Sequence, residues 1–101
     1  MEDEYPLLLD TFLDDSQKLL SQLHKARTAR DLGEAAHTLK GSSSNMGAFE
    51  LAKLCCQLEA SARKLPLCAM TDLIDKIDQE FAIVRQLYSD ERQRFPLVPV
   101  R

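Results

Sequence analysis

Tryptophan is absent from this chain of 101 residues, which also has only three cysteines, three glycines and four prolines. The cysteines, Cys55, Cys56 and Cys68, leave one thiol unpaired in any disulfide arrangement. None has the C-x-x-C spacing of a zinc or redox site, and no histidine is close to them in sequence. We therefore expect small buried thiols in a reducing compartment, and neither a disulfide framework nor a metal centre.

Long apolar runs are also missing: no apolar stretch approaches the ~20 residues that a membrane-spanning helix needs. The acidic start, Met-Glu-Asp-Glu, is the opposite of the basic head of a signal peptide. The chain has 13 basic and 16 acidic residues, which gives a net charge of −3. Proteins that bind nucleic acids or anionic membranes usually carry a basic patch. The sequence predicts a cytoplasmic monomer with no nucleic-acid or membrane partner.

The composition that remains is that of a single globular domain. About 45% of the residues are hydrophobic and 29% are charged. A chain of this length buries roughly two-thirds of its unfolded surface, which is enough for a core without metal or disulfides.

Apolar residues recur at spacings of three and four, and neither alternating β-branched runs nor Asn-Gly or Asp-Gly turns occur. Thr28 is a candidate N-cap, and Gly47 and Pro66 interrupt the helical pattern. The predicted helices cover about residues 5–26, 29–45, 48–64 and 70–94. Because short connections force neighbouring helices to run antiparallel, we predict an all-α, up-down-up-down four-helix bundle.

The bundle is expected over residues 5–95, between a flexible N-terminus at 1–4 and an extended tail at 96–101. The inward positions of the first and last helices are predicted from their spacing alone. They are Leu8, Leu9, Phe12, Leu19, Leu20, Leu23 and Ala26 in the first helix, and Leu73, Ile74, Ile77, Phe81, Val84, Leu87 and Tyr88 in the last.

His37 lies on the face of the second predicted helix that points away from the core. Gly33 precedes it by one turn and Gly41 follows it by one turn. A glycine inside a helix costs about 1 kcal/mol relative to alanine, so two of them indicate that the space beside the imidazole must stay clear. Lys40, three residues on, adds a positive charge suited to an incoming anion. The pattern predicts that a large partner reaches His37.

Glu59 lies on an otherwise small and apolar face of the third predicted helix, where a carboxylate needs a hydrogen-bonding partner. Antiparallel packing of the second and third helices across Gly47 brings Glu59 to the height of His37. Glu59 could then accept a hydrogen bond from Nδ1 of His37, leaving Nε2 exposed as a nucleophile. The alternative is a surface ion pair between Glu59 and Arg63, four residues on.

The segment from Ala36 to Gly47, A-H-T-L-K-G-S-S-S-N-M-G, resembles the signature A-H-x-L-K-G-S-[SA]-x-x-x-G of histidine-containing phosphotransfer (HPt) domains of the stand-alone bacterial type. The similarity covers about residues 5–92. It implies a phosphorelay carrier that accepts a phosphoryl group from the phospho-aspartate of a receiver domain in a hybrid sensor kinase. The carrier then passes the group to the aspartate of a response regulator.

The resemblance also implies a role for each matching residue. His37 would be the phosphoacceptor, Lys40 the basic neighbour of the phosphate, and Gly41, together with Gly33, would give steric clearance. Glu59 stands where several members of the family carry a glutamine that binds the imidazole.

We expect a phosphoryl carrier and not an enzyme, because the chain has no glycine-rich phosphate loop for ATP. It would need no cofactor of its own, and Mg²⁺ would come with the partner receiver domain. Leu8, Leu13, Met46 and Phe49, apolar residues at the edges of their helical stripes, are candidates for the docking surface.

Two other functions are compatible with the helical pattern. One is a non-catalytic helical adaptor that binds a signalling partner, with His37 incidental. The other is a dimerising kinase-type domain phosphorylated by an attached ATPase, for which these 101 residues contain no ATP-binding domain.

Overall fold

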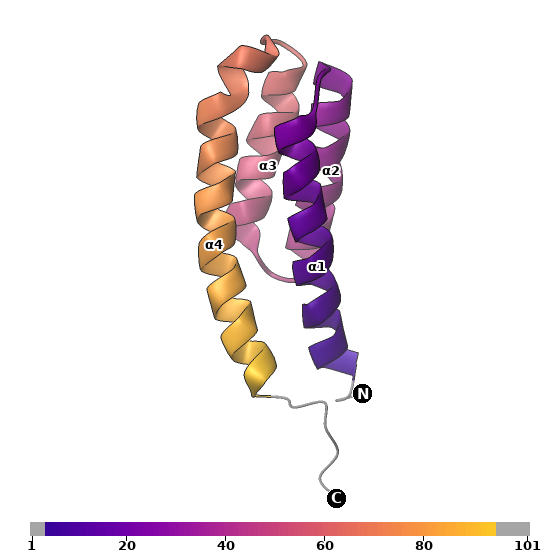
Figure 1. The fold of residues 1–101 in the computed structure, drawn as a ribbon, viewed down its shortest axis with the longest axis vertical. Helices are drawn as coiled ribbons and strands as arrows, with labels where there is room; N and C mark the ends of the chain where they lie inside the picture. The colour runs from indigo at the N-terminus through magenta and orange to yellow at the C-terminus, as the bar shows by residue number, and fades with distance from the viewer. Residues whose placement is uncertain (1–3, 95–101) are drawn as a thin grey trace, which may run out of the picture.

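A computed structural model describes residues 4–94, which form an antiparallel all-α bundle, as predicted, and contain no strand (Figure 1). Residues 1–3 of the predicted flexible N-terminus and the predicted tail at 96–101 lie outside the described residues, while Glu4 already belongs to the first helix. The elements are α1 (Glu4–Lys25), α2 (Ala29–Asn45), α3 (Phe49–Ala62), the 3₁₀ helix η1 (Leu67–Met70) and α4 (Thr71–Gln93).

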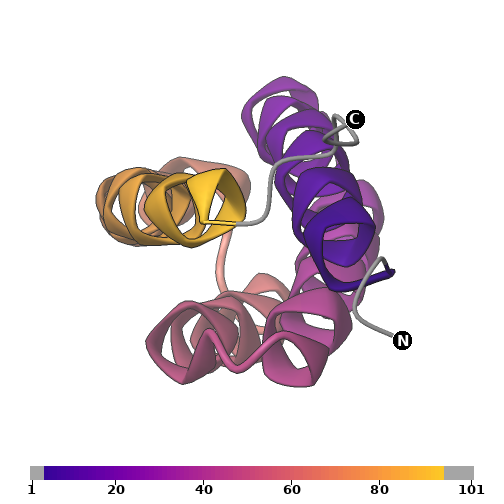
Figure 2. The ribbon, with the colours of Figure 1, turned by 90° about the horizontal axis from the view of Figure 1, so that it is seen from below.

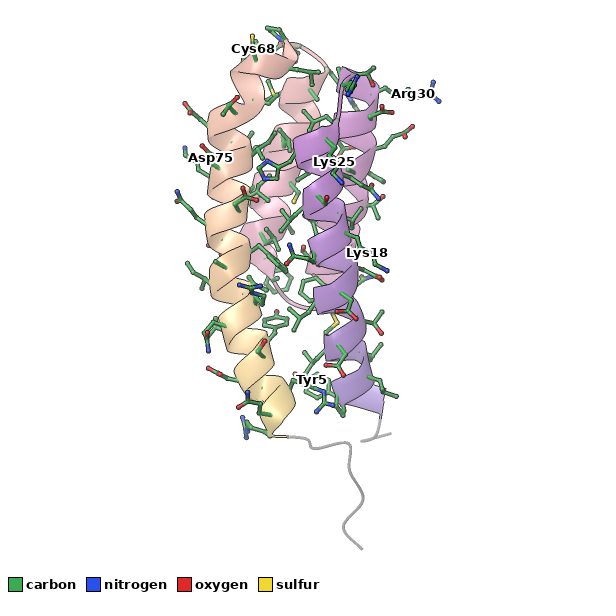
Figure 3. All side chains as sticks on the ribbon, viewed as in Figure 1. Tyr5, Lys18, Lys25, Arg30, Cys68 and Asp75 are labelled. Carbon is green, nitrogen blue, oxygen red and sulfur yellow. The ribbon has the colours of Figure 1, made fainter. Side chains whose placement is uncertain are left out.

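Viewed along the helices, α2 and α4 lie diagonally opposite, whereas α1 contacts both of them and α3 does the same (Figure 2). The closest packing is between α2 and α3, the two helices that carry the predicted site. Charged side chains such as Lys18, Lys25 and Asp75 point outward (Figure 3).

Local chemistry explains the bounds of α2. Thr28 has an extended backbone, and its hydroxyl accepts a hydrogen bond of 3.0 Å from the backbone N–H of Asp31, so it is the N-cap. Gly47 has φ +82°, a left-handed conformation that side chains disfavour, and it turns the chain into α3. α3 ends at Ala62, two residues earlier than expected. The break at Pro66 is followed by η1, so α4 begins at Thr71.

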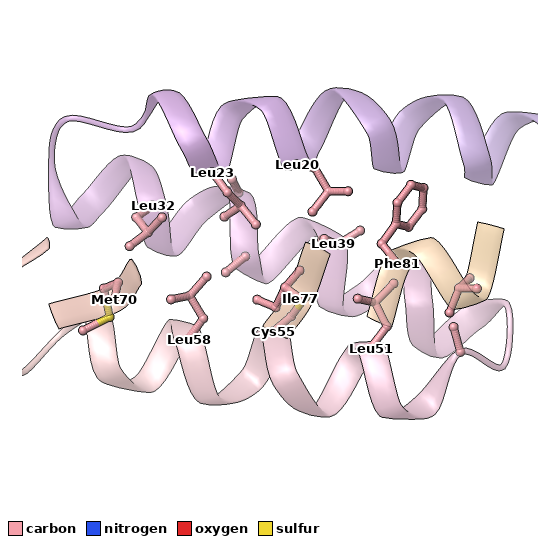
Figure 4. Packing of buried hydrophobic residues seen from close by; sticks show 14 of the residues in the cluster. Leu20, Leu23, Leu32, Leu39, Leu51, Cys55, Leu58, Met70, Ile77 and Phe81 are labelled. Atoms are coloured by element: carbon pink, nitrogen blue, oxygen red, sulfur yellow. The ribbon is translucent and has the colours of Figure 1, made fainter. Parts of the chain in front are cut away.

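The core is a continuous apolar cluster between the four helices (Figure 4). Two predicted members are wrong, because Leu8 and Leu87 are exposed. Leu9 and Tyr88, the predicted core residues next to them, are buried and partly buried respectively, and adjacent residues on a helix point about 100° apart. The fully buried large side chains include Leu9, Leu23, Leu32, Leu39, Leu51, Leu58, Met70 and Ile77.

The prediction of three buried thiols is correct only for Cys55. Cys56 is the next residue on the same helix and therefore faces outward, and Cys68 is exposed in η1. All three thiols are free. Burial raises the pKa of Cys55 to about 12, with a smaller contribution from Cys56, so Cys55 stays a neutral packing residue.

Candidate functional site

The imidazole of His37 projects from the middle of α2 into solvent. Its side chain is 65% exposed, while Ala36 and Leu39 on the other side of the helix are fully buried. The core stripe of α2 therefore fixes the direction in which the imidazole points.

The surface on both sides of His37 is open. A Cβ atom added at Gly33 or at Gly41 would meet no atom within 4 Å. Neither glycine has the positive φ that distinguishes Gly47. Within the described residues, then, no close contact and no backbone conformation requires a glycine at either position.

Glu59 reaches His37 from α3. Nδ1 of His37 lies 2.9 Å from Oε2 of Glu59, so the hydrogen bond predicted from the heights of the two residues is present. An ionised carboxylate only accepts hydrogen bonds, so Nδ1 is the donor, and in the neutral imidazole Nε2 is then the nitrogen that keeps a lone pair. Only 16% of the Glu59 side chain is exposed. The result is an exposed imidazole that is oriented by a carboxylate of the neighbouring helix.

The alternative partner of Glu59, Arg63, is also close but is held more loosely. Its Nη2 lies 3.7 Å from Oε2 of Glu59, which is beyond hydrogen-bonding distance, and its side chain is 77% exposed. Both interpretations of Glu59 from the sequence therefore describe real neighbours, and the bond to His37 is the shorter.

Lys40 has a partner that the sequence analysis missed. Its Nζ donates a hydrogen bond of 2.8 Å to Oε1 of Glu59. This hydrogen bond raises the pKa of Lys40, and the same bond is the main cause of a lowered pKa of the Glu59 carboxyl. Both groups are thus charged near neutral pH. The available signal was the three-residue spacing of His37 and Lys40, which turns both toward α3.

A groove of about 630 Å³ runs beside His37 between α2 and α3. Gly33 lines this groove, and its charged lining residues are Arg30 and Arg63 together with Glu34 and Glu59. Arg30 is paired with Glu34, at 3.2 Å. Arg63 was predicted from the sequence as a neighbour of Glu59, whereas Arg30, two turns before His37 on α2, was not predicted as a neighbour of the site.

The four docking candidates fall into two groups. Phe49, at the start of α3, is 71% exposed, and Leu8 on α1 is also exposed. Leu13 and Met46 pack against the core and are only partly accessible. Leu8 lies in the first turns of α1, and Phe49 is the first residue of α3, directly after the turn between α2 and α3.

Two kinds of site are absent from residues 4–94. No group of three or more His, Cys, Asp or Glu side chains there is placed to hold a metal ion. None of the helices in that range combines the length and the apolar character needed to cross a membrane.

Comparisons with known proteins agree on one family. The family model described as Hpt domain matches residues 7–87. The crystal structure of histidine-containing phosphotransfer protein B from Pseudomonas aeruginosa PAO1 is similar with a TM-score of 0.90 and 52% sequence identity, over 95% of this chain and 86% of that one. A search of curated proteins gave no match.

Proposed function

The chain belongs to the Hpt domain family, the histidine phosphotransfer carriers of two-component phosphorelays, and we propose that His37 is the residue that carries the phosphoryl group. One observation supports this assignment above the others. It is that the imidazole is exposed with its Nδ1 bonded to Glu59, while the helix positions one turn before and one turn after it are glycines in open space.

In the first transfer, His37 accepts the phosphoryl group from the phospho-aspartate of a receiver domain. The lone pair of Nε2 attacks phosphorus in line, an N–P bond forms, and the P–O bond to the aspartate breaks to regenerate its carboxylate. Nδ1 keeps its proton throughout, because Glu59 accepts the hydrogen bond on that side. No proton therefore has to leave the attacking nitrogen.

The second transfer is the reverse of the first. A carboxylate oxygen of another receiver attacks phosphorus, the N–P bond breaks, and its electron pair returns to Nε2. Family members act with receiver domains. For this chain we assign the donor to a hybrid sensor kinase and the acceptor to a response regulator.

Each remaining site residue has a distinct part in this proposal. Lys40 offsets negative charge on the phosphoryl oxygens. Gly33 and Gly41 leave room for the receiver, and Phe49 and Leu8 give it an apolar contact. We assign the Mg²⁺ expected to assist transfer to the partner receiver domain, and no step here depends on it.

Members of the family are carriers and not classical enzymes with an ATP site. We extend this to the chain itself, as a monomeric cytoplasmic carrier with no cofactor of its own. The kinase-type and adaptor alternatives make different predictions for labelling, so one assay separates the three.

The test is to incubate the chain with a ³²P-phosphorylated receiver, and separately with ATP alone. We expect acid-labile label from the receiver, none from ATP, and complete loss of label in His37→Gln. His24→Gln is the matched control, since His24 is the other histidine of the chain and lies on α1. Label retained in His37→Gln would contradict the assignment. Label from ATP would favour a kinase-type domain. Absence of label from both sources would favour an adaptor.

A further inference from the structure

The outer face of α4 carries two adjacent apolar side chains. Ile83 and Leu87 are one helical turn apart and are 54% and 60% exposed. Phe81 and Val84, on the core face of the same helix, are buried. α4 lies diagonally opposite α2, the helix that carries His37 (Figure 2). The docking of a receiver on His37 therefore leaves the exposure of this apolar pair unexplained.

Charged residues flank the apolar pair on both sides in a regular pattern. Steps of four, three, four, three and four residues keep six positions on one line along the helix, as in the seam of a coiled coil. These six residues form the α4 stripe: Lys76, Glu80, Ile83, Leu87, Asp90 and Arg94. Arg94 is the C-cap of α4 and still has a helical backbone. The charge order is positive, negative, apolar, apolar, negative, positive, and it reads the same in either chain direction, as does the spacing.

The charges of the α4 stripe are not used to hold the bundle together. Within residues 4–94, the side chains of Lys76 and Glu80 form no hydrogen bond or ion pair. Asp90 and Arg94 each bond to one neighbouring side chain of α4 itself, at 3.1 and 3.0 Å. None of the four is paired with another helix, so all four charges are available to a partner.

A second copy of the chain does not match the α4 stripe. If two copies paired antiparallel with Ile83 opposite Leu87, Glu80 would face Asp90 and the two basic ends would face each other. Parallel pairing in register places each residue opposite its own copy, so like charges face each other again. Like charges opposed along two packed helices are unfavourable. The matching stripe instead has two apolar residues flanked by basic residues, with acidic residues outside these.

We propose that the α4 stripe is a second docking surface, which binds an amphipathic helix of a partner protein whose own stripe reads acidic, basic, apolar, apolar, basic, acidic. Basic residues of this helix face Glu80 and Asp90, and its aliphatic residues cover Ile83 and Leu87. Charge order selects the partner, and the apolar pair supplies the area that is buried. Because the surface is on α4, the bound helix leaves His37 accessible, and binding does not depend on phosphorylation of His37.

Two designed peptides test the proposal, with fluorescence anisotropy as the measure of binding to the full chain. Each is an alanine-rich peptide of about 25 residues, long enough to form a helix in water. The first has Glu, Lys, Leu, Leu, Lys and Glu at the spacing of the α4 stripe. The second exchanges Lys and Glu, so it has the same composition but the charge order of α4 itself. The exchange turns four favourable pairs into four unfavourable ones, and we expect the first peptide to bind at least about tenfold more tightly.

Substitution of the apolar pair locates the binding. Leu87→Ser should weaken binding of the first peptide by about tenfold, because an aliphatic contact is lost. Leu7→Ser is the matched control and should leave binding unchanged, since Leu7 is an exposed leucine of α1. His37→Gln should bind both peptides as the wild type does, so failure of the phosphoacceptor assignment and failure of this docking surface are distinguishable.

Reversal of the acidic positions tests the role of charge order. Glu80→Lys combined with Asp90→Lys should invert the preference, so that the second peptide binds more tightly than the first. Asp14→Lys combined with Asp15→Lys makes the same change of net charge at exposed positions of α1 and should keep the wild-type preference. Circular dichroism on each variant shows whether the bundle is folded.

Three results would overturn the proposal. Equal binding of the two peptides, or a preference that the α1 control inverts as well, would mean that charge order along α4 does not select the partner. Failure of the full chain to bind either peptide would mean that no such helix docks there, whether the surface stays bare or is covered by residues 95–101. A dimer in sedimentation equilibrium that Leu87→Ser abolishes would identify a second copy of the chain as the occupant.

Discussion

The hydroxyl of Tyr88 donates a hydrogen bond of 2.7 Å to the backbone carbonyl of Met46, and so joins α4 to the turn between α2 and α3. That turn contains Gly47, and it sets how far α3 is shifted along α2. The shift in turn places Glu59 at the height of His37. A contact at one end of the bundle therefore supports the alignment of the site.

Tyr88→Phe should destabilise the fold by about 1 kcal/mol, because the carbonyl of Met46 loses its partner. Urea unfolding followed by circular dichroism measures this. Burial raises the pKa of Tyr88, so the folded state favours the neutral phenol. The wild-type advantage should be complete at neutral pH and should decline as the pH rises above about 10, where the unfolded phenol ionises. A gap between variant and wild type that persisted at high pH would contradict this account.

Much of the fold follows from sequence because local signals agree with it. Thr28 directly precedes α2 and Gly47 lies two residues after its end, and counting from Gly47 pairs Glu59 with His37. The errors arise where periodicity cannot choose between adjacent residues, as with Leu8 and Cys56. They also arise where side-chain conformation decides the contact.

The bond between Lys40 and Glu59 belongs to this second kind. Helical spacing places Lys40 beside His37, but an exposed lysine can extend into solvent or fold toward α3 with similar backbone geometry. Only the positions of its terminal atoms distinguish the two conformations. The hydrogen bond between Lys40 and Glu59 was therefore not predictable from the motif.

Gly41→Arg should stabilise the fold and at the same time slow phosphoryl transfer. Arginine has nearly the helix propensity of alanine and its Cβ meets no atom within 4 Å, so the fold should gain up to about 1 kcal/mol. The long side chain would obstruct the receiver beside His37 and slow transfer by about tenfold or more. Ala82→Arg, on α4, adds the same side chain on another helix and should transfer normally. An unchanged rate in Gly41→Arg would refute the role of Gly41 as clearance.

Phe49→Ala should weaken docking without changing the chemical step. Phe49 is exposed, so its removal should leave the unfolding free energy within about 0.5 kcal/mol of wild type. Burial of a phenylalanine side chain is worth ~1.5–3 kcal/mol, and we expect the receiver concentration for half-maximal transfer to rise about tenfold. Ile83→Ala on α4 is the control, an exposed aliphatic residue of another helix. An equal effect of the two changes would mean that Phe49 is not part of the interface.

Acid should reveal the charge of Glu59 directly. The hydrogen bond from Lys40 lowers the pKa of the Glu59 carboxyl. In the pH range between that lowered pKa and the ordinary value near 4.3, Glu59 is therefore ionised in the folded state and protonated in the unfolded chain. Unfolding then takes up a proton, and stability must fall as the pH drops through this window. Glu59→Gln should show a shallower decline of the unfolding free energy below pH 5, measured by urea titration. Glu50→Gln makes the same change of charge at an exposed position of α3 and corrects for the general effect of charge. Equal slopes of unfolding free energy against pH in wild type and Glu59→Gln would mean that Lys40 does not hold the Glu59 carboxylate in the ionised state.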